Sequence, residues 1–359
     1  MSANFTNVPG TRLELLEMMY HSAQREPLGN VRFLPFILKE DVQKFLPRLN
    51  VGRFRSQVQI FGDFYLLRLQ RIRVELDAEE EPVAGEFALF QTSGTVWCFC
   101  SIESTAVVGK TAIPAIQRHP SRASLIYIST REFRRIFDRL SAESNKVLIL
   151  QHSEYNRQES NVSYLRERKD YKAVFSELAA KDAVARRIAA EIHAHGVAVA
   201  AFSFNNNGLL SLRHGSIQFF VDRLVSEVAG IGNIRNSLFA DRERSRASLH
   251  PLELSFEKGI LADKAANSVL IDSLSSISKS AIAVFHSNPY VHVLYTDFRD
   301  GSSFNIYSSS DSTLTIVPST RASVSALMKL YRGISERFAD CDIAEASQNP
   351  PTMKEFFGE

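Results

Sequence analysis

The stretch that decides the fold is Ser280–Phe338, which reads SAIAVFHSNPYVHVLYTDFRDGSSFNIYSSSDSTLTIVPSTRASVSALMKLYRGISERF. It contains four short apolar runs, and residues that favour turns separate them. Apolar and polar side chains alternate along the second run, as they do in a strand with one buried face. The stretch therefore predicts an antiparallel meander of four strands, at Ala281–Phe285, Tyr290–Asp297, Ser302–Tyr307 and Thr313–Pro318.

The end of the same stretch predicts a helix that covers this meander. Thr320–Ser323 supplies hydroxyl side chains that can cap a helix. Apolar residues then recur at the i, i+3, i+4, i+7 spacing of a packed helix, at Val324, Leu327, Met328, Tyr331 and Ile334. We expect an α+β fold with mixed, mainly antiparallel sheets, helices packed on one face, and this four-strand meander followed by a helix near the C-terminus.

Length and composition indicate an ordinary globular protein. The 359 residues are 45% hydrophobic and 23% charged, with a net charge of +2. The molecule as a whole is not a polycation, so any nucleic-acid binding has to come from a local patch. Met1–Gly10 lacks the layout of a signal peptide, and the uncharged stretches contain too many polar residues to span a membrane. We expect a soluble, cytoplasmic protein.

The three cysteines, Cys98, Cys100 and Cys341, do not suggest a disulfide framework. Cys98 and Cys100 fall on one side of a strand-like run, and no second pair of metal-ligand residues accompanies them. We expect buried, reduced thiols, and neither a metal nor another cofactor.

The polar, aperiodic stretch His152–Ser163 suggests a boundary between domains. It predicts an N-terminal α+β domain over residues 1–150 and a C-terminal α+β domain over residues 160–343. Residues 344–359, which include two adjacent prolines, are expected to form a flexible tail. The charged, alanine-rich stretch Tyr164–His195 is expected to be mostly helical.

The most specific local pattern is Leu224–Leu238, which reads LVSEVAGIGNIRNSL. An apolar helix end, the triplet Gly230-Ile231-Gly232 and a new helix start resemble the helix-hairpin-helix motif of sequence-independent DNA-binding proteins. The resemblance implies that the glycines let the backbone approach a phosphate, which amides at the start of the second helix then hold. Ala229 stands where that family usually has proline. The alternative is a helix that ends at a glycine and is followed by another helix.

This pattern and the arginines after it give the predicted nucleic-acid-binding residues. The leading hypothesis is a non-catalytic protein that binds the nucleic-acid backbone with salt-sensitive affinity, as one component of a larger system. No catalytic residue is assigned. The residues expected to contact phosphate are Gly230, Gly232, Asn233, Arg235, Arg242, Arg244 and Arg246.

Two other functions stay open. The first is a metal-dependent phosphodiesterase or nuclease that uses His286, His292 and Asp297, with Asp300 nearby. The second is a protein–protein adaptor without nucleic-acid contact. In addition, a basic run at Arg53–Arg73 precedes the acidic residues of Glu75–Glu81, and it is either a phosphate-facing strand or a solvated face.

Overall fold

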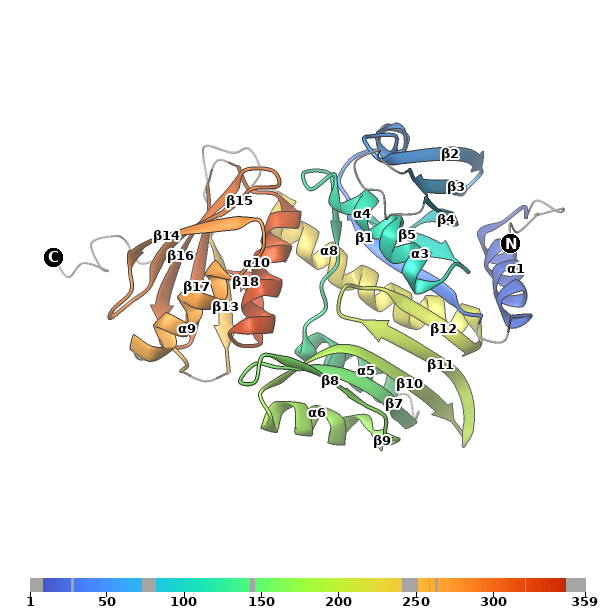
Figure 1. Ribbon diagram of the computed structural model, residues 1–359. Helices are drawn as coiled ribbons and strands as arrows, with labels where there is room; N and C mark the ends of the chain where they lie inside the picture. Colours follow the sequence, from blue (N-terminus) through green and yellow to red (C-terminus); the bar gives the residue numbers. More distant parts are fainter. Residues whose placement is uncertain are drawn as a thin grey trace. The chain divides into compact units, whose positions relative to one another are not determined.

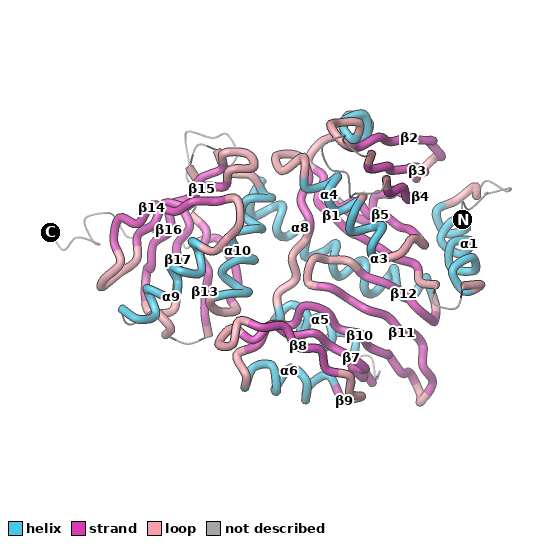
Figure 2. Tube along the Cα trace, viewed as in Figure 1, coloured by secondary structure: helices cyan, strands magenta, loops and turns pink. Residues whose placement is uncertain are grey.

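The computed structural model describes residues 9–26, 29–72, 82–142, 146–240, 251–257, 259–261, 264–319 and 321–346. The chain divides into two compact units (Figure 1). Unit 1 comprises Met1–Asn156 and Ser160–Asn233, and unit 2 comprises Arg157–Glu159 and Ile234–Glu359. Figure 2 shows that each unit contains a sheet with helices beside it. The predicted α+β class, with mainly antiparallel sheets, is confirmed.

Unit 1 is built on one twelve-stranded sheet in the order β2-β3-β4-β5-β1-β12-β11-β10-β7-β8, with β6 paired to β1 and β9 paired to β7. Each strand pair in it is antiparallel. The pairing of β1 with β12 joins the early strands to the late ones. The strands are β1 (Val31–Leu38), β2 (Phe54–Phe61), β3 (Phe64–Arg71), β4 (Val83–Ser93), β5 (Val96–Ser101), β6 (Ala123–Leu125), β7 (Lys146–Asn156), β8 (Asn161–Leu165), β9 (Lys169–Asp170), β10 (Ala183–Ala194), β11 (Val197–Asn205) and β12 (Leu210–Gly215).

One face of this sheet, here called the helical face, packs against helices at both ends of unit 1. The ring centroids of Phe133 and Phe204 lie 4.6 Å apart, and those of Phe220 and Phe33 lie 5.5 Å apart. These contacts bury alternate apolar residues of the central strands. The helices on this face are α1 (Arg12–Gln24), α5 (Thr130–Ala142), α6 (Tyr171–Ala180), α7 (Ile217–Phe220), the π-helical turn η2 (Val221–Val225) and the first part of α8 (Ser226–Ala240).

The opposite face of the sheet is covered only in part. Over β1, β3, β4 and β5 it packs against α2 (Val42–Phe45), η1 (Leu46–Leu49), α3 (Thr105–Lys110) and α4 (Ala112–Gln117), in a core that includes Phe36 and Phe99. Figure 1 shows α3 and α4 over this part of the sheet. The described helices that pack most closely on β7, β10 and β12 are α5, α6 and α7, which belong to the helical face. The opposite face of β7 and β10–β12, here called the open face, therefore has exposed or half-exposed side chains, as at Lys146, Arg187, Ala189 and Glu191.

Unit 2 contains the meander and the helix that the sequence predicts. Its sheet has the order β14-β15-β16-β17-β13-β18. Val291, Val293 and Tyr295 are fully buried, as the alternation along the second run requires. The elements are β13 (Leu252–Phe256), α9 (Lys264–Ser275), β14 (Ser280–His286), β15 (His292–Asp297), β16 (Ser302–Ser310), β17 (Thr313–Pro318), α10 (Val324–Arg337) and β18 (Cys341–Glu345).

The predicted helix-hairpin-helix is wrong, because Gly230 and Gly232 both lie inside the continuous helix α8. In an α-helix their amides donate to carbonyl groups four residues earlier, so they are not free to hold a phosphate. A glycine in a helix costs only about 1 kcal/mol relative to alanine, which packing can outweigh. Gly232 allows such packing. A Cβ atom at this position would lie 2.5 Å from Ile126 Cδ1 and 2.8 Å from Val96 Cγ2.

The structure also describes the suggested domain boundary, the stretch 164–195 and the start of the suggested tail. Strand β7 crosses the suggested boundary near residues 150–160 and pairs with β10, and residues 160–233 belong to unit 1. Residues 164–195 are not mostly helical, since they form the end of β8, then β9, α6 and β10. Of the suggested tail, Ala344 and Glu345 end strand β18, and residues 347–359 lie outside the described residues.

The three cysteines are buried and form no disulfide, as expected. Burial raises the pKa of the Cys98 and Cys100 thiols, which keeps them protonated and unreactive. No helix in the described ranges is long and apolar enough to cross a membrane.

Alanine substitution at the two glycines of α8 should have opposite effects on stability. At Gly230, where no atom lies within 4 Å of an added Cβ, alanine should raise the free energy of unfolding by about 0.5–1 kcal/mol through the lower entropy of the unfolded chain. At Gly232 it should lower that free energy by about 1–3 kcal/mol through overpacking against Ile126 and Val96. Urea denaturation followed by circular dichroism measures both. A Gly230→Ala variant that is destabilised would contradict a continuous helix.

Candidate functional site

The Asn233 side chain hydrogen-bonds α8 to the β4–β5 turn. Its Oδ1 accepts hydrogen bonds from the Thr95 backbone N–H at 3.1 Å and from the Thr95 hydroxyl at 3.3 Å. Its Nδ2 donates to Ser93 Oγ at 2.9 Å and to the Ser93 carbonyl at 3.3 Å. This side chain thus has a structural role within unit 1, and its amide group is occupied.

Of the predicted arginine ligands, only Arg235 lies in the described part of the chain, and it is not available to a phosphate. Arg235 is only 3% exposed, and its Cζ lies 4.2 Å from the centre of the Tyr331 ring within unit 2. A guanidinium buried against a ring cannot reach a phosphate in solvent. Arg242, Arg244 and Arg246 lie outside the described residues.

The basic run at Arg53–Arg73 is split between surfaces. Arg68 and Arg71 are an odd number of positions apart on β3, so they point to opposite faces of the sheet. Arg68 stands opposite Glu86 on β4. Burial lowers the pKa of Arg118, and the nearby Arg53 and Arg71 lower it further, so these three cations gather at one edge. Arg73 lies outside the described residues.

The structure pairs His286 with His292 across β14 and β15 but keeps both histidines of the alternative nuclease site away from its carboxylate. Asp297 and His292 occupy opposite ends of the six-residue strand β15. Asp297 is fully buried, and its Oδ2 lies 3.0 Å from both Arg299 Nη2 and Lys329 Nζ. Burial alone would raise the pKa of this carboxyl, but hydrogen bonds from Arg299 and Lys329 outweigh it and hold the pKa below its usual value. The carboxylate is therefore enclosed by cations and closed to substrate.

The two histidines, at the end of β14 and the start of β15, take part in ring contacts instead. His292 stacks on Tyr307 and His286 stacks on Tyr290, with centroid distances of 4.3 and 4.1 Å. Asp300 accepts a hydrogen bond from the Ser302 backbone N–H at 2.9 Å, which is an ordinary turn contact. In the described part of the chain, no three His, Cys, Asp or Glu side chains are placed to hold a metal ion.

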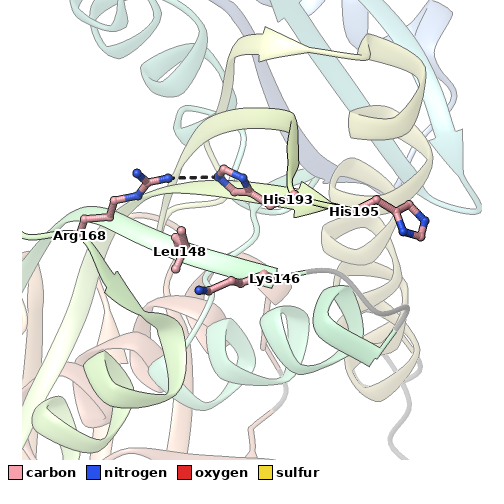
Figure 3. Close-up of a pocket in the computed structure, with 6 residues that line it drawn as sticks. Lys146, Leu148, Arg168, His193 and His195 are labelled. Atoms are coloured by element: carbon pink, nitrogen blue, oxygen red, sulfur yellow. Dashed lines mark hydrogen bonds between the residues drawn. The ribbon is translucent and has the colours of Figure 1, made fainter.

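The open face of unit 1 is better suited to bind a ligand than the predicted sites are, because it has a shallow depression of about 730 Å³ (Figure 3). Residues from three segments line it: the start of β7, the segment between β8 and β9, and the β10–β11 hairpin. Figure 3 shows Arg168 directed toward His193, and Lys146 and Leu148 on one adjoining strand, whereas His195 points away at the turn. The lining residues are Lys146, Leu148, Arg168, His193, His195 and Gly196.

Strand register explains why these residues meet. Lys146 pairs with His193 and Leu148 pairs with Glu191 in the antiparallel ladder, and paired residues project to the same face. His195 and Gly196 both have positive φ, 50° and 82°, as a two-residue type I′ hairpin requires. This tight turn carries the chain directly from β10 into β11. Sequence reasoning missed the site because it predicted helix here.

The depression carries an excess of positive charge. Arg168 Nη2 lies 3.2 Å from Glu191 Oε2 and 3.4 Å from His193 Nε2. His193 Nε2 also lies 3.1 Å from Glu191 Oε2, so one carboxylate serves two partners. Lys146 is exposed beside them. Two full cations, Lys146 and Arg168, thus face the single carboxylate of Glu191 among the described residues at this depression.

A strip of small side chains extends from the depression across the sheet. Ala189, Ser203 and Ser211 follow one another in register across β10, β11 and β12, and Arg32 on β1 ends this row. Burial lowers the pKa of Arg32, Glu103 opposes this effect, and Arg187 adds to it, so Arg187 lies close to Arg32. The Arg32 guanidinium donates to the Ile102 and Glu103 carbonyls and to the Thr105 hydroxyl, so Arg187 is the exposed cation beside this strip. A ligand backbone could approach the sheet closely over Ala189 and Ser203.

The buried carboxylate of unit 2 should contribute strongly to stability. Replacing Asp297 by Asn should lower the free energy of unfolding by about 3–5 kcal/mol near neutral pH, because it leaves Arg299 and Lys329 without their counter-charge. The folded pKa lies below the unfolded one, so this stabilisation is present above the unfolded pKa of about 4 and is lost as pH falls through the folded pKa. The difference between wild type and variant should therefore shrink in acid.

Urea denaturation over a pH series measures this effect. Asp272→Asn, at an exposed position of α9, is the matched control and should change stability by less than about 0.5 kcal/mol. Equal stability of wild type and Asp297→Asn near neutral pH would contradict a stabilising ion cluster.

Comparison with known proteins assigns the chain to no family. No protein-family model matches it, and a search of curated proteins finds no significant match. Function is therefore inferred from the geometry of the described residues alone.

Proposed function

We propose that the protein binds the phosphate backbone of nucleic acid, without catalysis, through the open face of unit 1. The observation that carries the proposal is the depression lined by Lys146, Arg168 and His193, in which Arg168 and His193 share the carboxylate of Glu191 and Lys146 is exposed. Binding of this kind fits one component of a larger system.

Charge and shape both favour an extended polyanion over a compact anion. Lys146 and Arg168 are exposed, so they can each neutralise a phosphate without first losing much hydration. Arg187 is also exposed on the same face, beyond the depression, so the positive charge is spread along the sheet. Ala189 and Ser203 between these cations leave room for a backbone to lie against the strands.

The same geometry argues against phosphodiester cleavage at the C-terminal histidines. Asp297 is enclosed by Arg299 and Lys329, and it lies at the far end of β15 from His292. A general acid and a general base have to reach one substrate, which these two residues do not. Binding is thus the function that the described residues support best.

Removing the two exposed cations should weaken binding and reduce its dependence on salt. The double variant Lys146→Ala/Arg168→Ala should bind a fluorescent oligonucleotide about tenfold or more weakly at about 50 mM salt. The slope of log affinity against log salt concentration should become shallower by roughly 1.5 to 2. The variant makes two fewer phosphate contacts, so its binding releases fewer counterions. Fluorescence anisotropy measures both quantities, with single-stranded and duplex oligonucleotides.

The matched control is Arg134→Ala/Lys172→Ala. It removes the same charge from exposed positions on α5 and α6, which cover the helical face. This variant should bind like wild type, apart from a small effect of net charge.

Two results would contradict the proposal in different ways. Absence of binding to any oligonucleotide at low salt would rule out the function and leave the adaptor hypothesis. Binding that survives Lys146→Ala/Arg168→Ala but is lost in Arg242→Ala/Arg244→Ala/Arg246→Ala would place the site in the segment that those arginines occupy.

A further inference from the structure

Three aromatic side chains from adjacent strands of unit 2 lie against one another at one end of the sheet. The rings of His292 and Tyr307 stack with centroids 4.3 Å apart and planes 24° apart. Phe285 lies 4.8 Å from His292 at 41°. Phe285, His292 and Tyr307, here called the ring cluster, come from β14, β15 and β16.

The ring cluster lies on the side of the sheet that faces away from the core of unit 2. Val293 and Ile306, which neighbour His292 and Tyr307 along their strands, are fully buried, so these two rings project to the other side. A bulge between Val284 and His286 places Phe285 beside His292. Phe285 is 60% exposed, although a phenyl ring normally gains by burial.

Polar side chains and one leucine lie next to the rings on the same side of the sheet. Next to His292, the ladder brings Leu294 and Asn305 together, and Thr296 and Ser303 form the following pair. His292 Nε2 lies 3.3 Å from Asn305 Oδ1. An amide and hydroxyl groups beside ring faces suit a neutral, planar ligand with hydrogen-bonding edges better than they suit an aliphatic surface.

We propose that the ring cluster stacks unpaired bases, so that the nucleic acid bound by this protein is single-stranded. This inference rests on the proposed function, because it names the kind of nucleic acid that the protein binds. Aromatic side chains on a sheet surface stack bases of any sequence, since every base has a π-face. In a duplex the bases already stack on each other and are out of reach of the rings.

The test substitutes the exposed ring and compares two oligonucleotides of equal length. Phe285→Ala and Phe285→Leu should each weaken binding of a labelled single-stranded oligothymidylate about tenfold, because leucine keeps apolar area but has no ring. Affinity for a labelled duplex and the salt slope for either ligand should stay as in wild type, since the phosphate contacts are in unit 1. Fluorescence anisotropy measures each affinity.

Phe298→Ala is the matched control. Phe298 is 64% exposed and directly follows the opposite end of β15, so this variant also removes an exposed ring from unit 2. It should bind both oligonucleotides like wild type. Tyr307→Leu, at a half-buried position of the ring cluster, should repeat the effect of Phe285→Leu, and circular dichroism checks that both variants are folded.

Several outcomes would overturn the inference. Full single-strand affinity in Phe285→Leu would mean that apolar contact, not stacking, is involved. Equal loss for single strand and duplex would remove the discrimination. A change from dimer to monomer in Phe285→Ala, seen by light scattering with unchanged oligonucleotide binding, would assign the ring cluster to a second copy of the chain. In all three cases the salt-dependent binding lost in Lys146→Ala/Arg168→Ala would still stand, whereas failure of the proposed function leaves no oligonucleotide bound.

Discussion

The antiparallel pairing of β1 with β12 is the interaction on which the architecture of unit 1 depends. It places Val31 opposite Leu212 and Phe33 opposite Leu210, and so joins strands far apart in the sequence into one sheet. The same register puts Arg32 in line with Ser211, Ser203 and Ala189. A shift by one residue would turn every second side chain to the other face. The buried core and the cationic open face are thus fixed by one ladder of hydrogen bonds.

Helix coverage then decides where function can reside. Within the described residues, helices cover the helical face over the central strands and the β1–β5 half of the opposite face. Strands β7 and β10–β12 therefore keep a surface with small and cationic side chains. Unit 2 has a chemically different surface, formed by the stacked rings of Phe285, His292 and Tyr307 beside Leu294 and Asn305. The proposals assign backbone contacts to the first surface and base contacts to the second. With such a division, the phosphate contacts would make affinity depend on salt, and base stacking would set the preference for single-stranded over duplex nucleic acid.

The sequence predicts the parts of the fold that rest on local patterns. The meander and α10 are confirmed because the alternation around Val293 and the spacing around Leu327 report burial directly. The Gly-Ile-Gly triplet misleads because the partners of Gly232 are Ile126 and Val96, which lie more than a hundred positions earlier. Helix propensity also fails for Ala183–Ala194, where pairing on both sides and packing from α5 and α6 favour a strand. The depression around Lys146 was missed for the same reason, although His195-Gly196 between alternating residues was a usable hairpin signal.

The central claim is that nucleic acid lies on the open face of unit 1, and photo-cross-linking tests it most directly. A single-stranded oligonucleotide with a photoreactive group on the phosphate backbone, placed at each position in turn, would be irradiated in complex with the full chain, and the cross-linked peptides identified by mass spectrometry. The account predicts cross-links in peptides from β7, the β10–β11 hairpin and the segment around Arg168. Cross-links confined to the peptides of α5 and α6, with none on these strands, would contradict it.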